Sequence, residues 1–166
     1  MDNNVVMAAM EVFQELGWSA VRFNFRGVGG STGAYGDGVG EREDLKAVCR
    51  FLRDQPKKPE LLCVVGYSFG ARVGLPVAIE DARVKGMVAI APPLEMYDFD
   101  FLKGSKKEKL VIVGNRDLYC PIERLRELYQ HLEDPKSLVV IQGADHFFSI
   151  HVKSLTPPLR ELFRET

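Results

Sequence analysis

The sequence lacks the features that mark membrane, secreted and nucleic-acid-binding proteins. No apolar run approaches the ~18 residues that a membrane-spanning helix needs. The opening stretch, MDNNVVMAAM, has no basic residue and so lacks the start of a secretory signal peptide. With 22 basic and 23 acidic residues the net charge is −1, which gives no reason to expect nucleic acid or an anionic membrane as a partner. We therefore expect a cytoplasmic protein.

The sequence also lacks the patterns of a disulfide framework, a zinc site and a nucleotide-binding loop. Its 3 cysteines contain no CxxC pair, which predicts free thiols in a reducing compartment. The glycine-rich stretch 26–40, RGVGGSTGAYGDGVG, has Thr32 where a GxGxxG pattern needs its third glycine, and no GxxxxGK[ST] occurs. We therefore expect neither a metal ion nor a cofactor.

What the sequence does contain is a regular alternation of helical and strand patterns. Its length of 166 residues and its 46% hydrophobic content suit one domain with a sizeable core. Such alternation predicts an α/β fold, a mostly parallel five-stranded sheet with helices on both faces. The predicted strands are 18–25, 61–66, 84–91, 109–114 and 137–143. The predicted helices are 4–16, 40–54, 69–80, 121–132 and a last one from near His146, broken at Pro157-Pro158.

Two local features interrupt this regular pattern. Pro76 lies inside the helix predicted at 69–80 and should kink or shorten it. Residues 92–108, PPLEMYDFDFLKGSKKE, stand where a regular crossover helix would come. They form either a short cap over the strand ends or an irregular solvent loop. No linker or second domain is predicted.

The stretch GYSFG, residues 66–70, lies between a predicted buried strand and a predicted helix. Ser68 is therefore either a nucleophile on a sharp strand-to-helix turn or an ordinary turn serine. Gly66 and Gly70 would allow a tight turn and leave the serine uncrowded. The N–H of Phe69 would then lie at the helix start, where a developing oxyanion could accept its hydrogen bond.

Two further polar residues follow later strands of the same predicted sheet. Asp117, in VIVGNRDLYCP, follows strand 109–114, and His146, in VVIQGADHFF, follows strand 137–143. Ligands of such sheets bind beyond the carboxyl ends of the strands. A serine hydroxyl needs a base to remove its proton, which His146 would do, and Asp117 would orient the imidazole.

Each of these assignments has a structural alternative. Asp117 could form an Asx turn or cap the helix that starts near Pro121, and His146 could be a plain helix-start histidine. Asp145 is the nearest rival acid, although an adjacent residue rarely points toward its neighbour's ring. His131 and His151 lie on predicted helices and are interpreted as structural.

With these residues assembled, the sequence resembles the α/β-hydrolase superfamily, and within it the compact bacterial serine hydrolases and esterases with little or no cap. The segments that carry the resemblance are FNFRGVGGSTG (23–33), VVGYSFGA (64–71), VIVGNRD (111–117) and GADHFF (143–148). The resemblance implies a three-layer α/β/α fold with Ser68 as nucleophile, Asp117 as acid, His146 as base and the Phe69 N–H as one oxyanion donor. It also implies a structural role for Arg26.

The sequence departs from this family at its N-terminal side. The family usually has three strands before the helix matching 4–16, and the third lies between the strands matching 18–25 and 61–66. The loop after that third strand supplies a second oxyanion N–H. We expect either that the chain is a shortened form of a longer protein or that strand 18–25 pairs directly with strand 61–66. Without the second donor the rate would fall by ~10²–10³.

The predicted function is that of a carboxylesterase-type serine hydrolase acting through an acyl-enzyme on a small ester, thioester or amide. The alternative is a catalytically weak or inactive α/β-hydrolase-like protein that binds a ligand. Tyr67 and Tyr119 are expected to contact the small-molecule substrate. A dienelactone-hydrolase-like function is disfavoured because that group usually has cysteine where this chain has Ser68, while peptidase activity stays open. An exposed strand edge could also produce a homo-oligomer.

Overall fold

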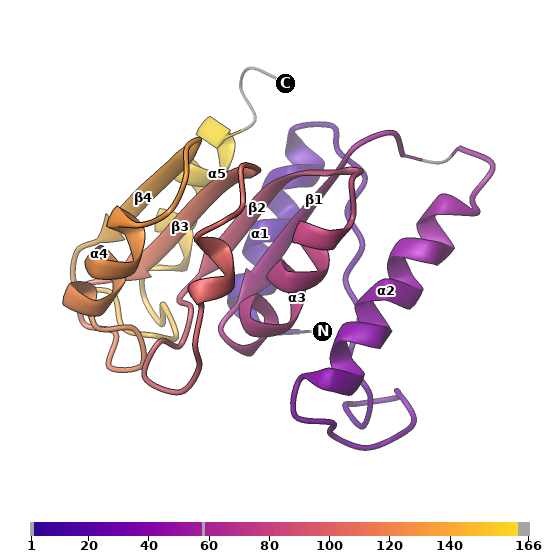
Figure 1. Ribbon diagram of the computed structural model, residues 1–166, viewed down its shortest axis with the longest axis horizontal. Helices are drawn as coiled ribbons and strands as arrows, with labels where there is room; N and C mark the ends of the chain where they lie inside the picture. Colours follow the sequence, from indigo (N-terminus) through magenta and orange to yellow (C-terminus); the bar gives the residue numbers. More distant parts are fainter. Residues whose placement is uncertain (1, 58, 163–166) are drawn as a thin grey trace.

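In the computed structural model, which describes residues 2–57 and 59–162, the centre of the protein is a four-stranded parallel sheet (Figure 1). The strands lie side by side in chain order and each neighbouring pair is parallel. Their carboxyl ends therefore meet at one edge of the sheet. The strands are β1 (Leu62–Tyr67), β2 (Val84–Ile90), β3 (Glu108–Gly114) and β4 (Lys136–Ile141).

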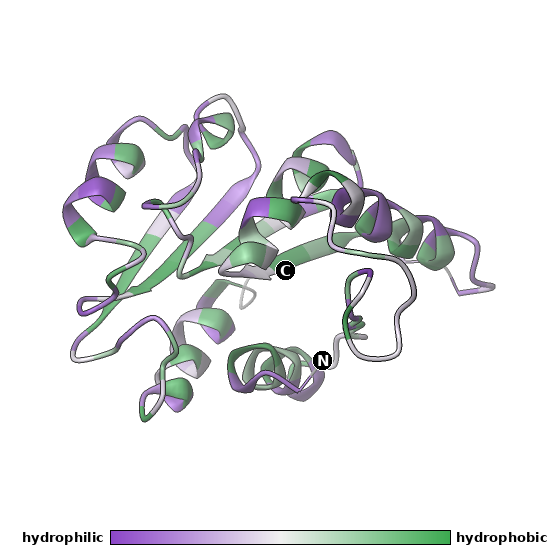
Figure 2. Ribbon diagram, turned by 90° about the horizontal axis from the view of Figure 1, so that it is seen from below, coloured by the Kyte–Doolittle hydropathy of each residue, from purple (hydrophilic) through white to green (hydrophobic). Residues whose placement is uncertain are grey.

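Helices cover both faces of this sheet (Figures 1 and 2). One face packs against α1 (Asn4–Glu15) and α5 (Thr156–Leu162), and the other against α3 (Phe69–Glu80) and α4 (Ile122–Gln130). The fifth helix, α2 (Val39–Arg53), packs on α3 beyond the β1 edge. The predicted α/β layering is thus present.

The central strands alternate their side chains between these two layers. In β2, Val88 and Ile90 belong to the core shared with α1 and α5, whereas Met87 and Ala89 belong to the core shared with α3. All four are at most 2% exposed. A parallel strand buried on both faces has to be apolar at nearly every position, which explains the continuous apolar runs in the sequence.

The sheet has four strands among the described residues, so the predicted five is wrong. Residues 18–25 belong to no strand, and residues 18–23 line a cavity that also borders β1. Backbone N–H and C=O groups form a strand only when a neighbouring backbone pairs with them. Because 18–25 and β1 do not pair, the expected direct pairing of 18–25 with 61–66 is also wrong.

Two expectations about proline also need correction. The helix after Ser68 is not shortened by Pro76, because α3 continues through it to Glu80. The last helix does not begin near His146: a 3₁₀ turn, η2 (Val152–Leu155), leads into α5, and Pro157 and Pro158 lie in the first turn of α5. Proline is well tolerated there, because a first-turn N–H has no helical acceptor to lose.

Residues 92–108 hold a short 3₁₀ helix, η1 (Asp100–Leu102), between β2 and β3. Leu94, Phe99 and Leu102 from this segment are buried in the core on the α3 side. The Tyr97 ring lies 6.3 Å from the ring of Phe69, the residue after Ser68. The segment is therefore anchored to the body of the protein beside the serine turn.

The glycine-rich loop after residue 25 is held by two acidic side chains of α2. Asp44 accepts hydrogen bonds from the Arg26 backbone N–H (2.9 Å) and from its guanidinium (2.7 Å). The buried Glu41 carboxylate accepts the N–H groups of Gly36 (2.8 Å) and Gly38 (2.9 Å). Arg26 thus fastens the loop to α2, as the structural interpretation predicts.

We expect Glu41→Gln to destabilise the protein by about 1–3 kcal/mol, because an amide NH₂ would then face a loop N–H that has lost its acceptor. Burial alone would raise the pKa of Glu41, but hydrogen bonds from the backbone N–H groups of Gly36, Glu41 and Gly38, together with the charge of Arg26, outweigh it and the pKa is lowered. The ionised carboxylate therefore stabilises the fold above its unfolded-state pKa, and this contribution is lost as pH falls through the folded-state pKa.

Urea unfolding of both proteins at neutral and acidic pH measures this effect. The difference between wild type and Glu41→Gln should shrink on acidification. Glu43→Gln is the matched control, since Glu43 lies on the same helix in an exposed ion pair with Lys46. Equal losses of stability in the two variants would contradict the role assigned to Glu41.

Candidate active site

Ser68 sits on a strained turn between β1 and α3. Its φ of 50° and ψ of −119° are unusual for any residue other than glycine. The backbone is held there because the Ser68 N–H donates to the Ile90 carbonyl (2.9 Å) and the Ser68 carbonyl accepts the Ala71 N–H (2.9 Å). The turn projects the serine at the carboxyl edge of the sheet.

The two glycines that flank this turn differ in what they contribute. A Cβ at Gly66 would come within 2.5 Å of Ala71 Cα and 2.6 Å of Ala71 N, which are backbone atoms of the following helix. A Cβ at Gly70 would meet no atom within 4 Å. Close approach of strand and helix therefore requires glycine at position 66 alone.

We expect Gly66→Ala to cost about 1–3 kcal/mol or more by overpacking the turn. Gly70→Ala should be neutral or stabilising by up to about 1 kcal/mol, since alanine is the better helix former. Chemical denaturation of the two variants tests this contrast. A Gly66→Ala protein as stable as wild type would refute the account of the turn.

The structure brings the three predicted site residues together. Ser68 Oγ lies 2.9 Å from His146 Nε2, and His146 Nδ1 lies 2.8 Å from Asp117 Oδ2 and 3.0 Å from Asp117 Oδ1. The side chains of His146 and Asp117 are 8% and 0% exposed. A serine, an imidazole and a carboxylate thus form a continuous chain of hydrogen bonds, buried at its acidic end.

Asp117 has both of the roles that the sequence allows, because it forms an Asx turn and also contacts His146. Its Oδ1 accepts the backbone N–H groups of Tyr119 (2.8 Å) and Cys120 (3.0 Å), as in an Asx turn. The same carboxylate receives the His146 ring. These two donors hold the carboxylate in place, so the turn orients Asp117 to accept the imidazole N–H.

The loops after β3 and β4 are tied together by contacts that the sequence analysis missed. A Cβ at Gly114 would come within 2.2 Å of the Ala144 carbonyl, so only glycine permits this approach. The same carbonyl accepts the Arg116 N–H (2.9 Å), and Asn115 Oδ1 accepts the Gly143 N–H (2.7 Å). The only sequence signal was the glycine that ends strand 109–114.

Aromatic side chains surround the His146 ring. The centroids of Tyr119, Phe147 and Tyr67 lie 4.7, 5.4 and 5.7 Å from its centroid. The Tyr67 hydroxyl donates to the His146 backbone carbonyl (3.2 Å). Burial, together with the charge of Asp117, raises the pKa of Tyr67 to about 12, so the hydroxyl keeps its proton. Tyr67, expected at the substrate, therefore contacts the histidine loop.

The remaining polar candidates lie apart from this chain of hydrogen bonds. Asp145 accepts from the Ser149 N–H (3.3 Å) and hydroxyl (3.2 Å), on its own loop. His131 contacts the Glu127 carbonyl at the end of α4 (2.8 Å). His151 lies against the Gly143 turn.

Phe69 is the first residue of α3. Its N–H therefore has no carbonyl acceptor within the helix and is available to a ligand. The helix dipole adds positive potential at this point. The Phe69 ring contacts the rings of Phe25 (6.0 Å), just before the glycine-rich loop, of Tyr35 (5.7 Å) in that loop, and of Tyr97 (6.3 Å) in the 92–108 segment.

Comparison with known proteins agrees with this fold. An α/β serine hydrolase homologue from Coxiella burnetii has 36% sequence identity and a TM-score of 0.90, with 98% of this chain and 77% of that chain covered. The chain belongs to the α/β-hydrolase superfamily. The model of the X-Pro dipeptidyl-peptidase (S15) family also matches, over residues 2–116.

Two further relatives extend the comparison. A serine hydrolase without lid from Xanthomonas campestris has 34% identity and a TM-score of 0.89, covering 99% of this chain and 74% of its own. An uncharacterized protein of Rickettsia prowazekii is 29% identical over 97% of this chain and 71% of its own length. This hydrolase therefore matches its relatives over nearly its whole length, while each relative has additional residues.

The described part of this hydrolase contains neither a metal-binding cluster nor a membrane-spanning helix. Within residues 2–57 and 59–162, no group of His, Cys, Asp and Glu side chains has an arrangement that could hold a metal ion. None of the helices in these ranges combines the length and apolarity needed to span a bilayer.

Proposed function

We propose that this α/β-hydrolase is a carboxylesterase-type serine hydrolase that acts through an acyl-enzyme on a small ester, thioester or amide. The observation that carries the proposal is the hydrogen-bonded order Ser68, His146, Asp117, with 2.9 Å between Ser68 Oγ and His146 Nε2. This distance is within the reach that proton transfer to a general base requires.

In the proposed first half-reaction, His146 Nε2 removes the Ser68 proton while Oγ attacks the carbonyl carbon. Asp117 holds Nδ1–H and stabilises the imidazolium that forms. The tetrahedral intermediate then collapses as His146 returns the proton to the leaving alcohol, thiol or amine. In the second half-reaction a water molecule attacks the acyl-serine by the same route, releasing the acid and regenerating Ser68.

The carbonyl oxygen would become negatively charged beside α3. We assign the Phe69 N–H as its donor, because it lies at the helix start directly after the nucleophile. Tyr119, 42% exposed and tilted against the His146 ring, would line the approach of the substrate. Tyr67 would instead hold the loop that carries His146, because its hydroxyl donates to the His146 backbone carbonyl.

The extents of two matches along the chain favour ester hydrolysis over peptide hydrolysis. The match to the peptidase family ends at residue 116, before Asp117 and His146. An esterase domain from Rhodothermus marinus, by contrast, is 25% identical over 96% of this chain, with a TM-score of 0.72. We therefore place small esters first among the substrates.

Covalent labelling tests the proposal. The chain should react with a fluorophosphonate probe at Ser68, and mass spectrometry should find the adduct on the peptide that contains it. His146→Ala should lose the labelling, whereas His131→Ala should retain it. Absence of labelling, together with no hydrolysis of short nitrophenyl esters, would favour the alternative of an inactive ligand-binding protein.

A further inference from the structure

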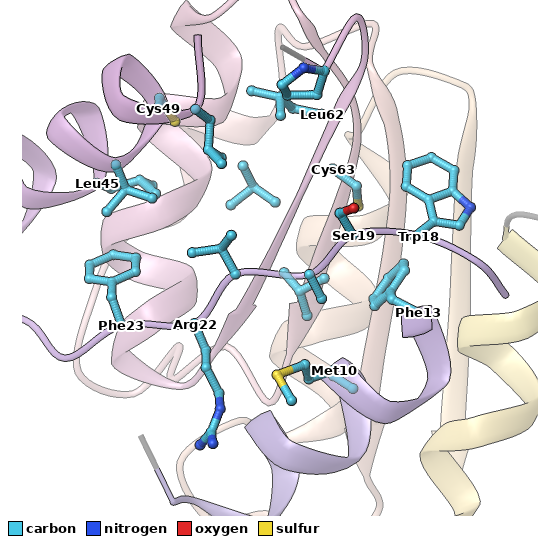
Figure 3. A pocket seen from close by; sticks show the side chains of 18 of the residues that line it. Met10, Phe13, Trp18, Ser19, Arg22, Phe23, Leu45, Cys49, Leu62 and Cys63 are labelled. Carbon is cyan, nitrogen blue, oxygen red and sulfur yellow. The ribbon is translucent and has the colours of Figure 1, made fainter. Parts of the chain in front are cut away.

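A cavity of about 860 Å³ lies along β1, between apolar side chains of α1 and α2 (Figure 3). Tyr67 borders this cavity, but none of Ser68, Asp117 and His146 does. The cavity therefore does not contain the reacting atoms. The groups on either side of the scissile carbonyl have to be recognised by the surface around Ser68 and His146.

The proposed mechanism, on which this inference rests, fixes where the leaving group lies. His146 Nε2 takes the proton of Ser68 Oγ, 2.9 Å away, and returns it to the leaving oxygen as the ester C–O bond breaks. The leaving oxygen therefore has to come within hydrogen-bond distance of the same nitrogen. The carbonyl oxygen turns to the Phe69 N–H, so the acyl chain points away from both. Whatever the leaving oxygen carries is packed beside the imidazole.

Two partly exposed aromatic rings border this imidazole. The centroid of the Tyr119 ring lies 4.7 Å from that of His146, and the centroid of the Phe147 ring lies 5.4 Å from it. The His146 side chain is only 8% exposed, whereas Tyr119 and Phe147 are 42% and 56% exposed. The third neighbouring ring, Tyr67, is held by its hydrogen bond to the His146 carbonyl. A group bound beside the imidazole therefore contacts Tyr119 and Phe147.

The surroundings of these two rings are apolar as well. Three more exposed apolar residues come from the loops after β2, β3 and β4: Met96, Leu118 and Ile150. The Glu95 N–H donates to the Tyr119 carbonyl (3.0 Å), which brings the loop after β2 beside this ring. The acidic neighbours are already engaged, since Glu95 pairs with Arg124 (2.9 Å) and Asp145 accepts from Ser149 (3.3 Å). Exposed apolar side chains gathered at one place mark a binding surface, and this one favours an uncharged, apolar leaving group.

We propose that Tyr119 and Phe147 bind the leaving group, and that this hydrolase prefers esters whose alcohol carries an aromatic ring over esters of small alkyl alcohols. An aromatic ring packs against other rings edge to face or offset, at centroid distances of about 4.5–7 Å, and gains more than its buried area alone supplies. A methyl or ethyl group is too small to cover either ring. Tyr119 and Phe147 thus determine specificity, while the triad carries out the chemistry.

Two other roles would also place aromatic rings here. The rings could only shield the contact between His146 and Asp117 from water, and removing one would then slow the hydrolysis of all esters equally. They could instead bind an aromatic acyl group, and the preference would then be for esters of aromatic acids. Each role predicts a different pattern of rates for esters that differ only in where they carry the ring.

Two isomeric esters separate these roles. Benzyl acetate and methyl phenylacetate contain the same atoms, but the ring is on the alcohol in the first and on the acid in the second. Both release an alkyl alcohol and neither has a ring conjugated to the carbonyl, so their intrinsic reactivities are similar. We expect kcat/KM of the wild-type protein to be higher for benzyl acetate by roughly ten-fold or more. Titration of the released acid measures both rates.

Removal of either ring should abolish this preference. Tyr119→Ala and Phe147→Ala are each expected to lower kcat/KM for benzyl acetate by roughly ten-fold, mainly by raising KM, and to change that for methyl phenylacetate less than about three-fold. Alanine preserves the backbone contacts of both residues, from the Tyr119 N–H to Asp117 (2.8 Å) and from the Asn4 amide to the Phe147 carbonyl (3.3 Å). Phe51→Ala is the matched control, because Phe51 is 61% exposed on α2 and should not affect either ester.

Several results would overturn the proposal. Equal losses for the two esters in Tyr119→Ala and Phe147→Ala would leave the rings with a shielding role, and losses confined to methyl phenylacetate would assign them to the acyl group. The same loss in Phe51→Ala would show that the effect does not come from this surface. Labelling of Ser68 by the fluorophosphonate probe together with equal rates for both esters would refute the preference alone. Absence of both labelling and turnover would overturn the proposed function, and this inference with it.

Discussion

Replacement of Ser68 by alanine is expected to lower the rate of hydrolysis of a short nitrophenyl ester by roughly 10⁴-fold or more. The loss is this large because no other described hydroxyl lies within hydrogen-bond reach of His146 Nε2. The fold should be retained, since the turn is held by backbone hydrogen bonds to Ile90 and Ala71 that alanine preserves. Initial rates at saturating substrate measure the loss of catalysis, and urea unfolding of the same samples measures any loss of stability.

Ser154→Ala is the matched control for this substitution. Ser154 is exposed and lies in η2, away from the hydrogen-bonded chain. Its variant should hydrolyse the ester at the wild-type rate. If Ser68→Ala kept more than a few per cent of the activity while folded, the nucleophile would have to be sought elsewhere.

The second large effect is expected for Asp117→Asn, which should lower the turnover rate by up to ~10⁴ while leaving the fold intact. The asparagine can still accept the N–H groups of Tyr119 and Cys120 through its carbonyl oxygen. It lacks the negative charge that stabilises the His146 imidazolium, and its NH₂ group would face His146 Nδ1 and select the wrong tautomer. The effect should fall on kcat far more than on KM.

Asp145→Asn is the matched control, because Asp145 is one residue from His146 but bonds to Ser149 instead. It should change the turnover rate less than ten-fold. Equal losses in the two variants would mean that the charge of the loop matters, and not the contact between Asp117 and His146.

The sequence predicts most of this site because the site depends on short local patterns. Ser68, Asp117 and His146 each follow an apolar strand, and parallel strands bring their carboxyl ends together. What it does not reveal is how the loops are fastened. The approach of Gly114 to Ala144 and the bond from Tyr67 to the His146 carbonyl join residues distant in the chain. No periodic pattern in the sequence predicts such contacts.

The fold was predictable where an element supplies its own signals and not where it depends on a neighbour. Asn3 caps α1 through its side chain, and Gly38 precedes α2, so both helices begin within a residue of where the sequence places them. Residues 18–25 have an equally clear strand pattern. They fail to form one because a strand, unlike a helix, takes its hydrogen bonds from another segment.

The order of the strands has a consequence for how the sheet forms and opens. Since β1 to β4 are neighbours in the same order as in the chain, each strand can add to its predecessor as soon as it has been synthesised. Contacts between successive elements close short loops, which favours rapid folding. In native-state hydrogen exchange, the amides of β2 and β3 should be the slowest to exchange, because both strands are paired on two sides. The amides of the two edge strands, β1 and β4, should exchange sooner, and β1 is the strand that leads into Ser68.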